Sequence, residues 1–573
     1  MPSSEISQSE ISSRNWIWLS LICLGCVVLM SGLPVPQGYD ITQHLRFAAS
    51  YREAILDGSF IPGWAGVDNL GYGSVGVRFY PPLADFILAV THIFTNDWYL
   101  AFLINSFFWM FPGCIGVYFW VKEFRTPKYA ALAGFLYAVV PYHLLQVYRM
   151  QLYSEFVAAA ILPFCFLFAT KVIKTERRFD VLGLSLSCSL LLLTHIPSSL
   201  IGLSGLAFYT AFLIDWKRPF RSIANVALAA ILTILSNSFY LVRLLTEVKW
   251  VKHSSDEFST GFFDFNRHLF PLLYSFGEDY WKEEKLAILD QTVILTILFF
   301  IPMVYCLVRI RSIDFKSNFE KRLFIAVSVA GVFSVFILSE ASSFVWQAIP
   351  ILQKIQFPWR FLLLASLIAV VSLTYGLSLI LESKRISRPM IYLTISAVFL
   401  TLVFDATRAV WIPDRMPREE FNQRATANRE KEGCSCWFPV WGEVAALESG
   451  EKARAENRTV EIKSWTDLTR TIILSAGDSK ELRVGTFYYP YWKAEVNGQK
   501  AEVGKDANGA ILLAVPTESV EVKLYFEEPR KVRFTKWLSL VFWILGLAGF
   551  VFSFGMRNRR RTTLVSNPTG NPQ

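Results

Sequence analysis

Residues 359–381 read WRFLLLASLIAVVSLTYGLSLIL, a stretch in which Arg360 is the one charged residue. About 20 consecutive apolar residues are enough for a helix to cross a hydrocarbon core of roughly 30 Å. Comparable apolar stretches recur along the first 410 positions, and the whole chain is 53% hydrophobic and only 18% charged. This composition excludes an ordinary soluble globular protein. Because a bilayer offers the backbone no water, the apolar stretches are predicted to be helices.

The basic residues lie between these stretches and recur in every second loop. They are Lys122, Arg125 and Lys128; Lys171, Lys174, Arg177 and Arg178; Lys217, Arg218 and Arg221; and those within 309–322, 384–388 and 557–561. Loops rich in Lys and Arg stay on the cytoplasmic side of a membrane. The formal charge of +9 therefore indicates topology, and no nucleic acid partner is expected.

With the basic loops inside, the sequence predicts about twelve crossings and two cytoplasmic termini. The predicted crossings are 15–33, 98–121, 129–146, 156–172, 180–196, 199–214, 222–242, 289–308, 323–340, 359–381, 389–410 and 534–556. The first is interpreted as a retained anchor, because no small-residue cleavage site follows it. Segment 83–95 is apolar but too short to span, so a re-entrant or interfacial segment is expected.

The fold class predicted is a mainly α, polytopic membrane protein with a C-terminal extracytoplasmic β-sandwich. Residues 1–410 form the transmembrane domain, with outer loops at 34–97, 147–155 and 243–288. Residues 411–533 form the β-rich domain, followed by the final helix 534–556 and the basic cytoplasmic tail 557–573. Alternating segments at 458–462, 471–474 and 520–526 have the period of half-buried strands. Asn497-Gly498 predicts a tight hairpin turn.

Six of the eight cysteines fall inside apolar stretches and are interpreted as small core residues. Cys434 and Cys436 lie in the water-exposed domain. A C-x-C pair is a poor metal site by itself, and its close spacing would strain a disulfide between the two cysteines. A structural or incidental role is expected.

The first outer loop contains Asp40 and His44, four residues apart and so on one face of a helix. A carboxylate at the membrane surface can act as a base or bind a cation. Alternatively, Asp40 caps the helix that follows and His44 is merely interfacial. Farther along the same loop comes Arg78-Phe79-Tyr80-Pro81-Pro82.

Other ionisable residues lie at the outer ends of predicted crossings. Arg149 and Glu155 flank one short outer turn, and His195 lies near the next. Such groups are functional candidates by default, although an Arg149–Glu155 ion pair is the structural alternative. Gln356-Phe357-Pro358-Trp359-Arg360 opens a crossing from outside. There the Arg360 guanidinium can hold a phosphate, or alternatively snorkel to lipid headgroups.

These motifs, in this order and on one side of the membrane, resemble the GT-C superfamily of membrane glycosyltransferases. More closely, Gly38-Tyr39-Asp40 with His44, Tyr80-Pro81-Pro82, Arg149 with Glu155, His195-Ile196-Pro197 and the Gln356–Arg360 motif resemble a bacterial membrane family labelled 6-pyruvoyl-tetrahydropterin synthase-related. Nothing in the sequence resembles a soluble pterin enzyme. The segment Phe487-Tyr488-Tyr489-Pro490-Tyr491-Trp492 is similar to the extracytoplasmic β-domain of GT-C-like proteins.

The resemblance implies a polyprenyl-phosphate sugar donor in the outer leaflet and an envelope or extracytoplasmic acceptor that the sequence does not identify. It also implies that Asp40 is the catalytic base and Glu155 the second acid. The implied substrate-binding residues are His44, Arg78, Tyr80, Arg149, His195, Gln356, Trp359 and Arg360. No cofactor is expected: the first loop lacks the Asp-x-Asp or Glu-Asp pair that would favour a divalent metal.

Two other functions fit the same patterns. A transporter or flippase for lipid-linked saccharides also needs charged residues in the bundle, but the apolar pattern shows no clear inverted repeat. A catalytically inactive GT-C-like scaffold whose β-domain binds surface glycan is the third possibility.

Overall fold

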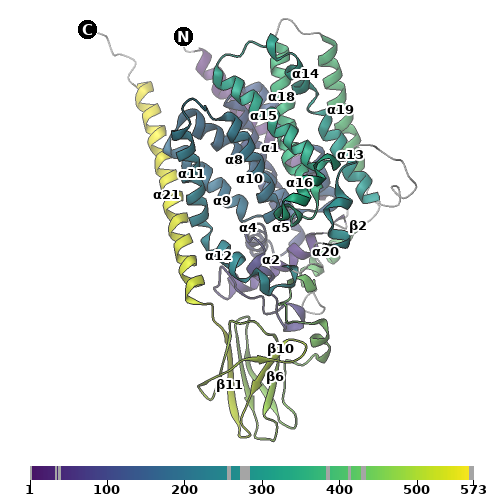
Figure 1. The fold of residues 1–573 in the computed structure, drawn as a ribbon, viewed down its shortest axis with the longest axis vertical. Coiled ribbons are helices and arrows are strands. Elements are labelled where there is room, and N and C mark those ends of the chain that lie inside the picture. Colours follow the sequence, from purple (N-terminus) through teal and green to yellow (C-terminus); the bar gives the residue numbers. More distant parts are fainter. Residues whose placement is uncertain are drawn as a thin grey trace.

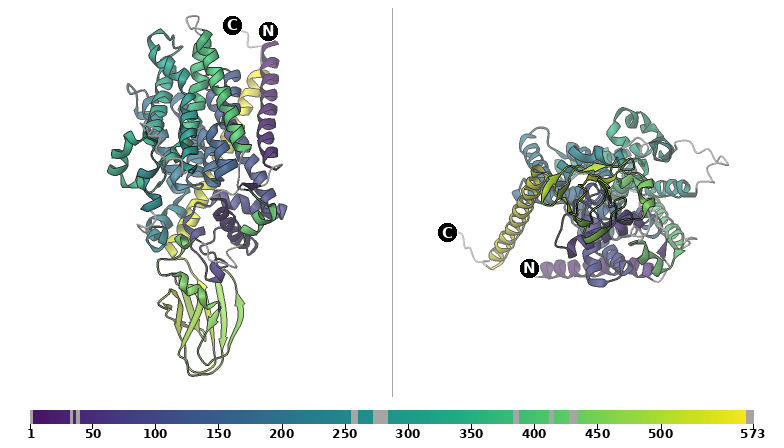
Figure 2. Two further views of the ribbon diagram at one scale, coloured as in Figure 1. Left: turned by 90° about the vertical axis from the view of Figure 1, so that its right-hand side faces the viewer. Right: turned by 90° about the horizontal axis from the view of Figure 1, so that it is seen from below.

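A computed structural model gives the fold of the protein (Figures 1 and 2). It describes residues 3–31, 35–36, 40–254, 260–271, 284–382, 388–410, 415–426 and 434–566. Gly38 and Tyr39 of the first motif therefore lie outside the described residues.

Long helices form one bundle, and every predicted crossing falls on a helix. In chain order the longer helices are α1 (Ser3–Ser31), α2 (Ile41–Leu56), α4 (Leu83–Thr95), α5 (Trp98–Lys122), α6 (Pro127–Ala138), α8 (Tyr153–Thr175), α9 (Arg178–Leu192), α10 (Ile196–Leu213), α11 (Phe220–Ser236), α12 (Ser238–Glu247), α13 (Glu284–Leu298), α14 (Ile301–Val308), α15 (Asn318–Leu338), α18 (Leu362–Glu382), α19 (Arg388–Val410) and α21 (Arg530–Ser566). Shorter helical segments connect them: α3 (Gly76–Phe79), α7 (Pro141–Leu145), α16 (Ser343–Ala348), α17 (Pro350–Gln353) and α20 (Arg418–Arg424).

Within the described residues, seven helices are long and apolar enough to span a membrane, or nine if two bent pairs each count as one span. The bent pairs bend by 71° between α11 and α12 and by 43° between α13 and α14. The remaining predicted crossings fall on α9 and on shorter apolar parts of α1 and α19. A multi-pass helical membrane protein is thus confirmed.

Helix α18 lies at the centre of the bundle, and α21 lies at its edge. In the most apolar window of the span Pro358–Glu382, 94% of the residues are buried inside the protein, against 6% for Arg530–Ser553. A helix apolar on all sides can be covered by other helices or by lipid tails. Gly376 lets α18 approach α14 closely, because a Cβ there would lie 2.7 Å from the backbone of Pro302.

Segment 83–95 forms the 13-residue helix α4, as expected for an element too short to span. It packs against α2 and α5 at the end of the bundle that faces the β-domain (Figure 1). Helix α21 runs from the β-domain along the bundle to the opposite end, where α1 begins (Figures 1 and 2). The β-domain therefore covers one end of the bundle, and the beginning of α1 and the end of α21 lie at the opposite end.

The β-domain consists of two antiparallel sheets, which confirms the predicted sandwich class. The strands are β3 (Ala453–Arg454), β4 (Val460–Trp465), β5 (Thr469–Leu474), β6 (Glu481–Phe487), β7 (Trp492–Val496), β8 (Gln499–Ala501), β9 (Gly504–Lys505), β10 (Ala510–Ala514) and β11 (Val520–Phe526). Their orders are β3-β6-β10-β9 and β4-β5-β11-β7-β8. Asn497 and Gly498 join β7 to β8 with φ values of 50° and 79°, as a type I′ hairpin turn requires.

The segment before the sandwich returns to the helical bundle. Strand β2 (Arg415–Met416) pairs with β1 (Val35–Pro36), the strand that precedes α2 in the chain. Helix α20 is held by Asp97, which caps α5 through the Leu100 amide and accepts a 2.8 Å hydrogen bond from Arg418. This segment thus packs with the transmembrane helices rather than with the sheets.

A buried cluster of charges joins the β-domain to the bundle. Arg78 donates from Nε to Glu247 at 2.6 Å and from Nη1 to Glu528 at 2.5 Å. Arg243 also donates to Glu528, at 2.6 Å, and the hydroxyls of Tyr489 and Tyr491 donate to Glu247. Although burial raises the pKa of Glu528, the charges of Arg243 and Arg78 lower it to about 2. The carboxylate is therefore ionised at neutral pH, as the interface requires.

We expect Arg78→Met to loosen the contact between the β-domain and the bundle. The Arg78 side chain is fully buried, and removal of one partner from a buried ion pair costs about 3–5 kcal/mol. Thermal unfolding in detergent and limited proteolysis of the β-domain measure the change. Lys523→Met, on the exposed side of β11, is the control and should leave both unchanged. A wild-type melting temperature for Arg78→Met would mean that the cluster does not hold the domains together.

Candidate active site at the β-domain end of the bundle

Polar side chains from α2, α4, α8, α10 and the 3-10 helix η11 (Pro358–Phe361) meet at one end of the bundle. Each lies at or just before the first turn of its helix, so these helix beginnings converge. A first turn leaves backbone N–H groups without helical partners and favours negative charge. The helix beginnings thus favour the acids in the cluster. Their convergence also brings two histidines and an arginine together with these acids within a mainly apolar protein.

The ion pair between Glu155 and Arg360 is the centre of this cluster. The distance from Arg360 Nε to Glu155 Oε1 is 2.8 Å, and the side chains are 10% and 3% exposed. The hydroxyl of Tyr142 donates to Glu155 Oε2 at 2.6 Å. Arg360 also donates from Nη1 to the carbonyl of Ile355 at 2.8 Å and lies over the ring of Phe357. The guanidinium is thus fixed in position at the start of α18.

Asp40 stands at the N-cap position, directly before Ile41 of α2, but its side chain does not cap the helix. Its backbone carbonyl accepts from the amides of Gln43 and His44, whereas its half-buried carboxylate interacts electrostatically with His44, Tyr80 and Glu155. The capping alternative is therefore wrong for the side chain. The structure brings Asp40 together with Glu155, although 114 positions separate them in the sequence.

His44 pairs with Asp85, which lies in the first turn of α4. His44 Nδ1 is 2.8 Å from Asp85 Oδ1, both residues are buried, and Ser154 Oγ lies 3.5 Å from the same nitrogen. Burial lowers the pKa of His44, but the charges of Asp85 and Asp40 outweigh it and raise the pKa above its ordinary value. The pair joins α2 to α4 beside Asp40.

Tyr80 and His195 complete the cluster. The ring of Tyr80 lies 5.4 Å from His44 and 6.3 Å from His195, measured between centroids. Burial lowers the pKa of His195 well below its usual range, and the charges of Arg360 and His44 lower it further. His195 is therefore neutral, with Nδ1 2.9 Å from Ser198 Oγ.

Four residues predicted to bind substrate either lie outside the cluster around Glu155 and Arg360 or make their main contacts with residues outside it. Arg78 belongs to the charge cluster between the domains. Arg149 lies on a π-helical turn, η2 (Gln146–Met150), and the alternative of an Arg149–Glu155 ion pair is wrong because Glu155 pairs with Arg360. Gln356 is buried with a φ of 67°, and Trp359 stacks on Phe357.

The sequence patterns did not single out Asp85, Tyr142 or Trp437. Asp85 carried a signal, because it is the one acidic residue in the apolar segment 83–95. Trp437 follows Cys434 and Cys436, which form a disulfide, and its ring lies 5.8 Å from Tyr80 and 4.9 Å from His253. The segment before the β-sandwich therefore covers the cluster, which the sequence alone did not indicate.

Across the part of the chain that the structure describes, no group of three or more His, Cys, Asp or Glu side chains is arranged to hold a metal ion. The expectation of a site without a metal stays a prediction.

A family model described as a 6-pyruvoyl-tetrahydropterin synthase related domain of a membrane protein matches residues 77–410. The chain belongs to this membrane protein family. The matched range contains Tyr80, Glu155, His195 and Arg360 but begins after Asp40. No curated protein matches the chain.

Two solved structures are similar to the chain at low sequence identity. Mycobacterial arabinofuranosyltransferase AftD has 11% identity and a TM-score of 0.41 over 69% of this chain, which spans 27% of AftD. ArnT from Cupriavidus metallidurans, in a structure with bound undecaprenyl phosphate, has 10% identity and a TM-score of 0.37 over 76% of each chain. At these identities neither structure assigns a role to a residue here.

We expect Glu155→Gln to lower the stability of the transmembrane domain. The substitution keeps the size of the side chain but leaves the Arg360 charge buried without its carboxylate, a loss of about 3–5 kcal/mol. The measurement is thermal unfolding in detergent. Glu443→Gln is the matched control, because Glu443 pairs with Lys252 and its side chain is 54% exposed. Such an exposed ion pair should contribute at most about 1 kcal/mol. Equal losses in the two variants would contradict a central role for the buried pair.

Proposed function

We propose that this protein is a membrane glycosyltransferase that transfers a sugar from a polyprenyl-phosphate donor to an envelope or extracytoplasmic acceptor. The observation that carries the proposal is the convergence of Asp40, whose side chain does not cap α2, with the fixed Glu155–Arg360 pair. The motif resemblance to GT-C enzymes supports the same activity.

Glycosyl transfer needs positive charge where the phosphate leaves the sugar. Arg360 fits this role because its Nε forms an ion pair with Glu155 and its Nη1 donates a hydrogen bond to the Ile355 carbonyl, while Nη2 makes no hydrogen bond among the described residues. A planar guanidinium fixed in this way can bind phosphate oxygens without reorganising as charge develops. Glu155 then positions Arg360, with Tyr142 as its second partner.

Asp40 fits the role of general base. It would accept the proton of an acceptor hydroxyl while that oxygen bonds to the anomeric carbon and the polyprenyl phosphate departs with the electron pair of the broken C–O bond. The phenol of Tyr80 and the neutral His195 lie around this place as hydrogen-bonding groups. Burial raises the pKa of Tyr80 well above its usual range, and the charges of Asp40 and Asp85 raise it further, so the phenol keeps its proton.

A transporter would have to open the opposite end of the bundle, where a buried ion pair holds the helices together. Arg125 donates to Glu320 at 2.7 Å and lies 4.3 Å from the ring of Tyr375. This pair connects the segment after α5 to α15 and α18. We therefore favour an enzyme whose chemistry stays at one end of the bundle.

We expect Asp40→Asn to abolish most transfer while the protein stays folded and still binds donor. Loss of a general base lowers the rate by a factor of about 10² to 10⁴. The assay is transfer from a polyprenyl-phosphate sugar in detergent, with donor binding measured in parallel. Asp57→Asn, at the exposed far end of α2, is the control. Wild-type transfer by Asp40→Asn would make the base assignment wrong, and absence of donor binding to the wild type would favour the scaffold alternative.

Arg360→Lys should weaken donor binding although it keeps the positive charge. Lysine is a point charge and cannot hold Glu155, a carbonyl and a phosphate with one planar group. Equilibrium binding of a polyprenyl phosphate to the two forms tests this expectation. Arg418→Lys, at the half-exposed pair with Asp97, should bind like the wild type. Equal binding by Arg360→Lys would support the alternative in which Arg360 contacts only lipid headgroups.

The proposal places the β-domain outside the cell and the opposite loops inside. Single cysteines at Lys500 and Lys217, which lie on exposed surfaces of β8 and of the loop before α11, test this orientation. An impermeant thiol reagent should label Lys500→Cys in intact cells, whereas Lys217→Cys should react only after lysis. The wild type gives the background, because its free cysteines within the described residues are buried. Labelling of Lys217→Cys in intact cells would reverse the orientation.

A further inference from the structure

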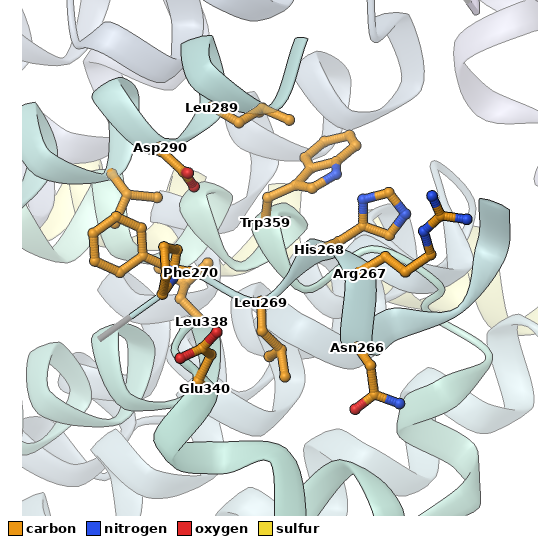
Figure 3. A pocket seen from close by; sticks show the side chains of 12 residues that line it. Asn266, Arg267, His268, Leu269, Phe270, Leu289, Asp290, Leu338, Glu340 and Trp359 are labelled. Carbon is orange, nitrogen blue, oxygen red and sulfur yellow. The ribbon is translucent and has the colours of Figure 1, made fainter. Parts of the chain in front are cut away.

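A second site lies beside the candidate active site, at the beginning of η11. It is a cavity of ≈ 200 Å³ between the segment 266–271, α13 and the end of α15. Figure 3 shows the side chains that line it. Its polar and aromatic lining comprises Asn266, Arg267, His268, Asp290, Glu340 and Trp359.

The wall of the cavity is fixed by the backbone. The Phe270 amide donates to the Leu338 carbonyl at 2.8 Å, and the Glu340 amide donates to the Phe270 carbonyl at 3.0 Å. Phe265, at the start of the 3-10 helix η7 (Phe265–His268), stacks on Trp346 of α16. The cavity is thus held open by paired segments rather than by loosely placed side chains.

Buried rings lie deep in the cavity, and polar side chains surround its mouth. Trp359 and His268 are buried, whereas Asn266, Arg267 and Glu340 are exposed. In Figure 3 the carboxylates of Asp290 and Glu340 lie to one side of the view, and Trp359 and His268 lie to the other. Because the lining carries both signs of charge, it suits an uncharged ligand with many hydroxyls better than a phosphate.

The size of the cavity limits the ligand. Sites for drug-sized molecules occupy about 300–1,000 Å³, and this cavity is smaller. One sugar ring fits the size and the chemistry, since its C–H face can lie on an indole while carboxylates and amides bond to its hydroxyls.

Aromatic side chains connect this cavity to the proposed phosphate-binding arginine, whose guanidinium carbon lies 5.8 Å from the centre of the Trp359 ring. The ring of Phe357 lies 4.8 Å from that of His268, in the cavity wall, and 4.8 Å from the guanidinium carbon of Arg360. Trp359 faces the cavity and the next residue, Arg360, faces Glu155. Segment η11 therefore contributes to both sites.

We propose that this cavity is a saccharide subsite that binds one pyranose ring, with Trp359 as the stacking surface and Asp290 and Glu340 as hydroxyl acceptors. The inference rests on the proposed glycosyltransferase function and deepens it, because it places a sugar-binding position next to the reacting groups. The ring can belong to the acceptor glycan or to the lipid-linked donor.

Saturation-transfer NMR on the full-length protein in detergent tests the subsite with methyl glucopyranoside, methyl mannopyranoside and methyl N-acetylglucosaminide as probes. At least one probe should receive saturation from the wild type. Trp359→Leu should reduce that signal by at least about fivefold, since an aromatic anchor contributes much of the binding free energy of a small site. The isosteric Asp290→Asn should reduce it as well, and it keeps the test valid if Trp359→Leu does not fold. Trp216→Leu, at an exposed tryptophan on the loop before α11, is the matched control.

Saturation of every probe to the same extent in wild type, Trp359→Leu and Asp290→Asn would overturn the subsite, as would no saturation of any probe. An added polyprenyl-phosphate hexose identifies the source of the ring: displacement of the probe assigns the cavity to the donor sugar, and simultaneous binding assigns it to the acceptor. Probe binding without any transfer activity would contradict the proposed enzyme but leave the subsite in place. Transfer activity together with probe binding that does not depend on Trp359 would contradict the subsite but leave the proposed enzyme in place.

Discussion

The absence of water from the hydrocarbon core is the constraint on which the rest of this structure depends. Inside the core each backbone group must bond within its own helix, and isolated charges are costly. Helix α18 satisfies both conditions, since from Leu362 to Ile380 no side chain is charged. Polar chemistry is consequently confined to helix ends, and Asp40, Glu155 and Arg360 all lie there.

Charges that are buried near these ends occur in pairs or networks. The Glu155–Arg360 pair and the Arg78 cluster use the same principle for different purposes. In the first, a carboxylate fixes a guanidinium whose remaining nitrogen is proposed to bind a phosphate. In the second, Glu247 and Glu528 hold the β-domain against the helices, so that the segment with Trp437 stays over Tyr80. The second network thus supports the geometry of the first.

Segment η11 shows how one short turn can serve two neighbouring sites. Pro358 begins a 3-10 turn, in which successive side chains point about 120° apart. Trp359 lines the cavity beside α13 and Arg360 pairs with the carboxylate on α8, although the guanidinium also lies 5.8 Å from the Trp359 ring. Phe357 lies between the two, so a sugar ring in the cavity would lie close to the proposed phosphate-binding group.

The sequence by itself determined the helical crossings, the β-rich domain and the residue types available for chemistry. The length of an apolar stretch and the alternation of apolar and polar residues in 520–526 are local properties of the sequence. The helices and strands follow from them. The hairpin at Asn497-Gly498 is local for the same reason, because left-handed φ values favour these residues. Asp40, His44, Tyr80, Glu155, His195 and Arg360 also stand out by their position at the ends of apolar stretches.

Only the tertiary structure decided which of these residues meet. Arg149 is nearer to Glu155 in the sequence, yet Arg360 pairs with that carboxylate because the first turns of α8 and α18 lie side by side. Arg78, predicted to bind substrate, instead pairs with Glu247 and Glu528, which come from distant segments of the chain. Pairing energies between charges depend on distance and burial. Helix packing sets both, and no local pattern of residues encodes them.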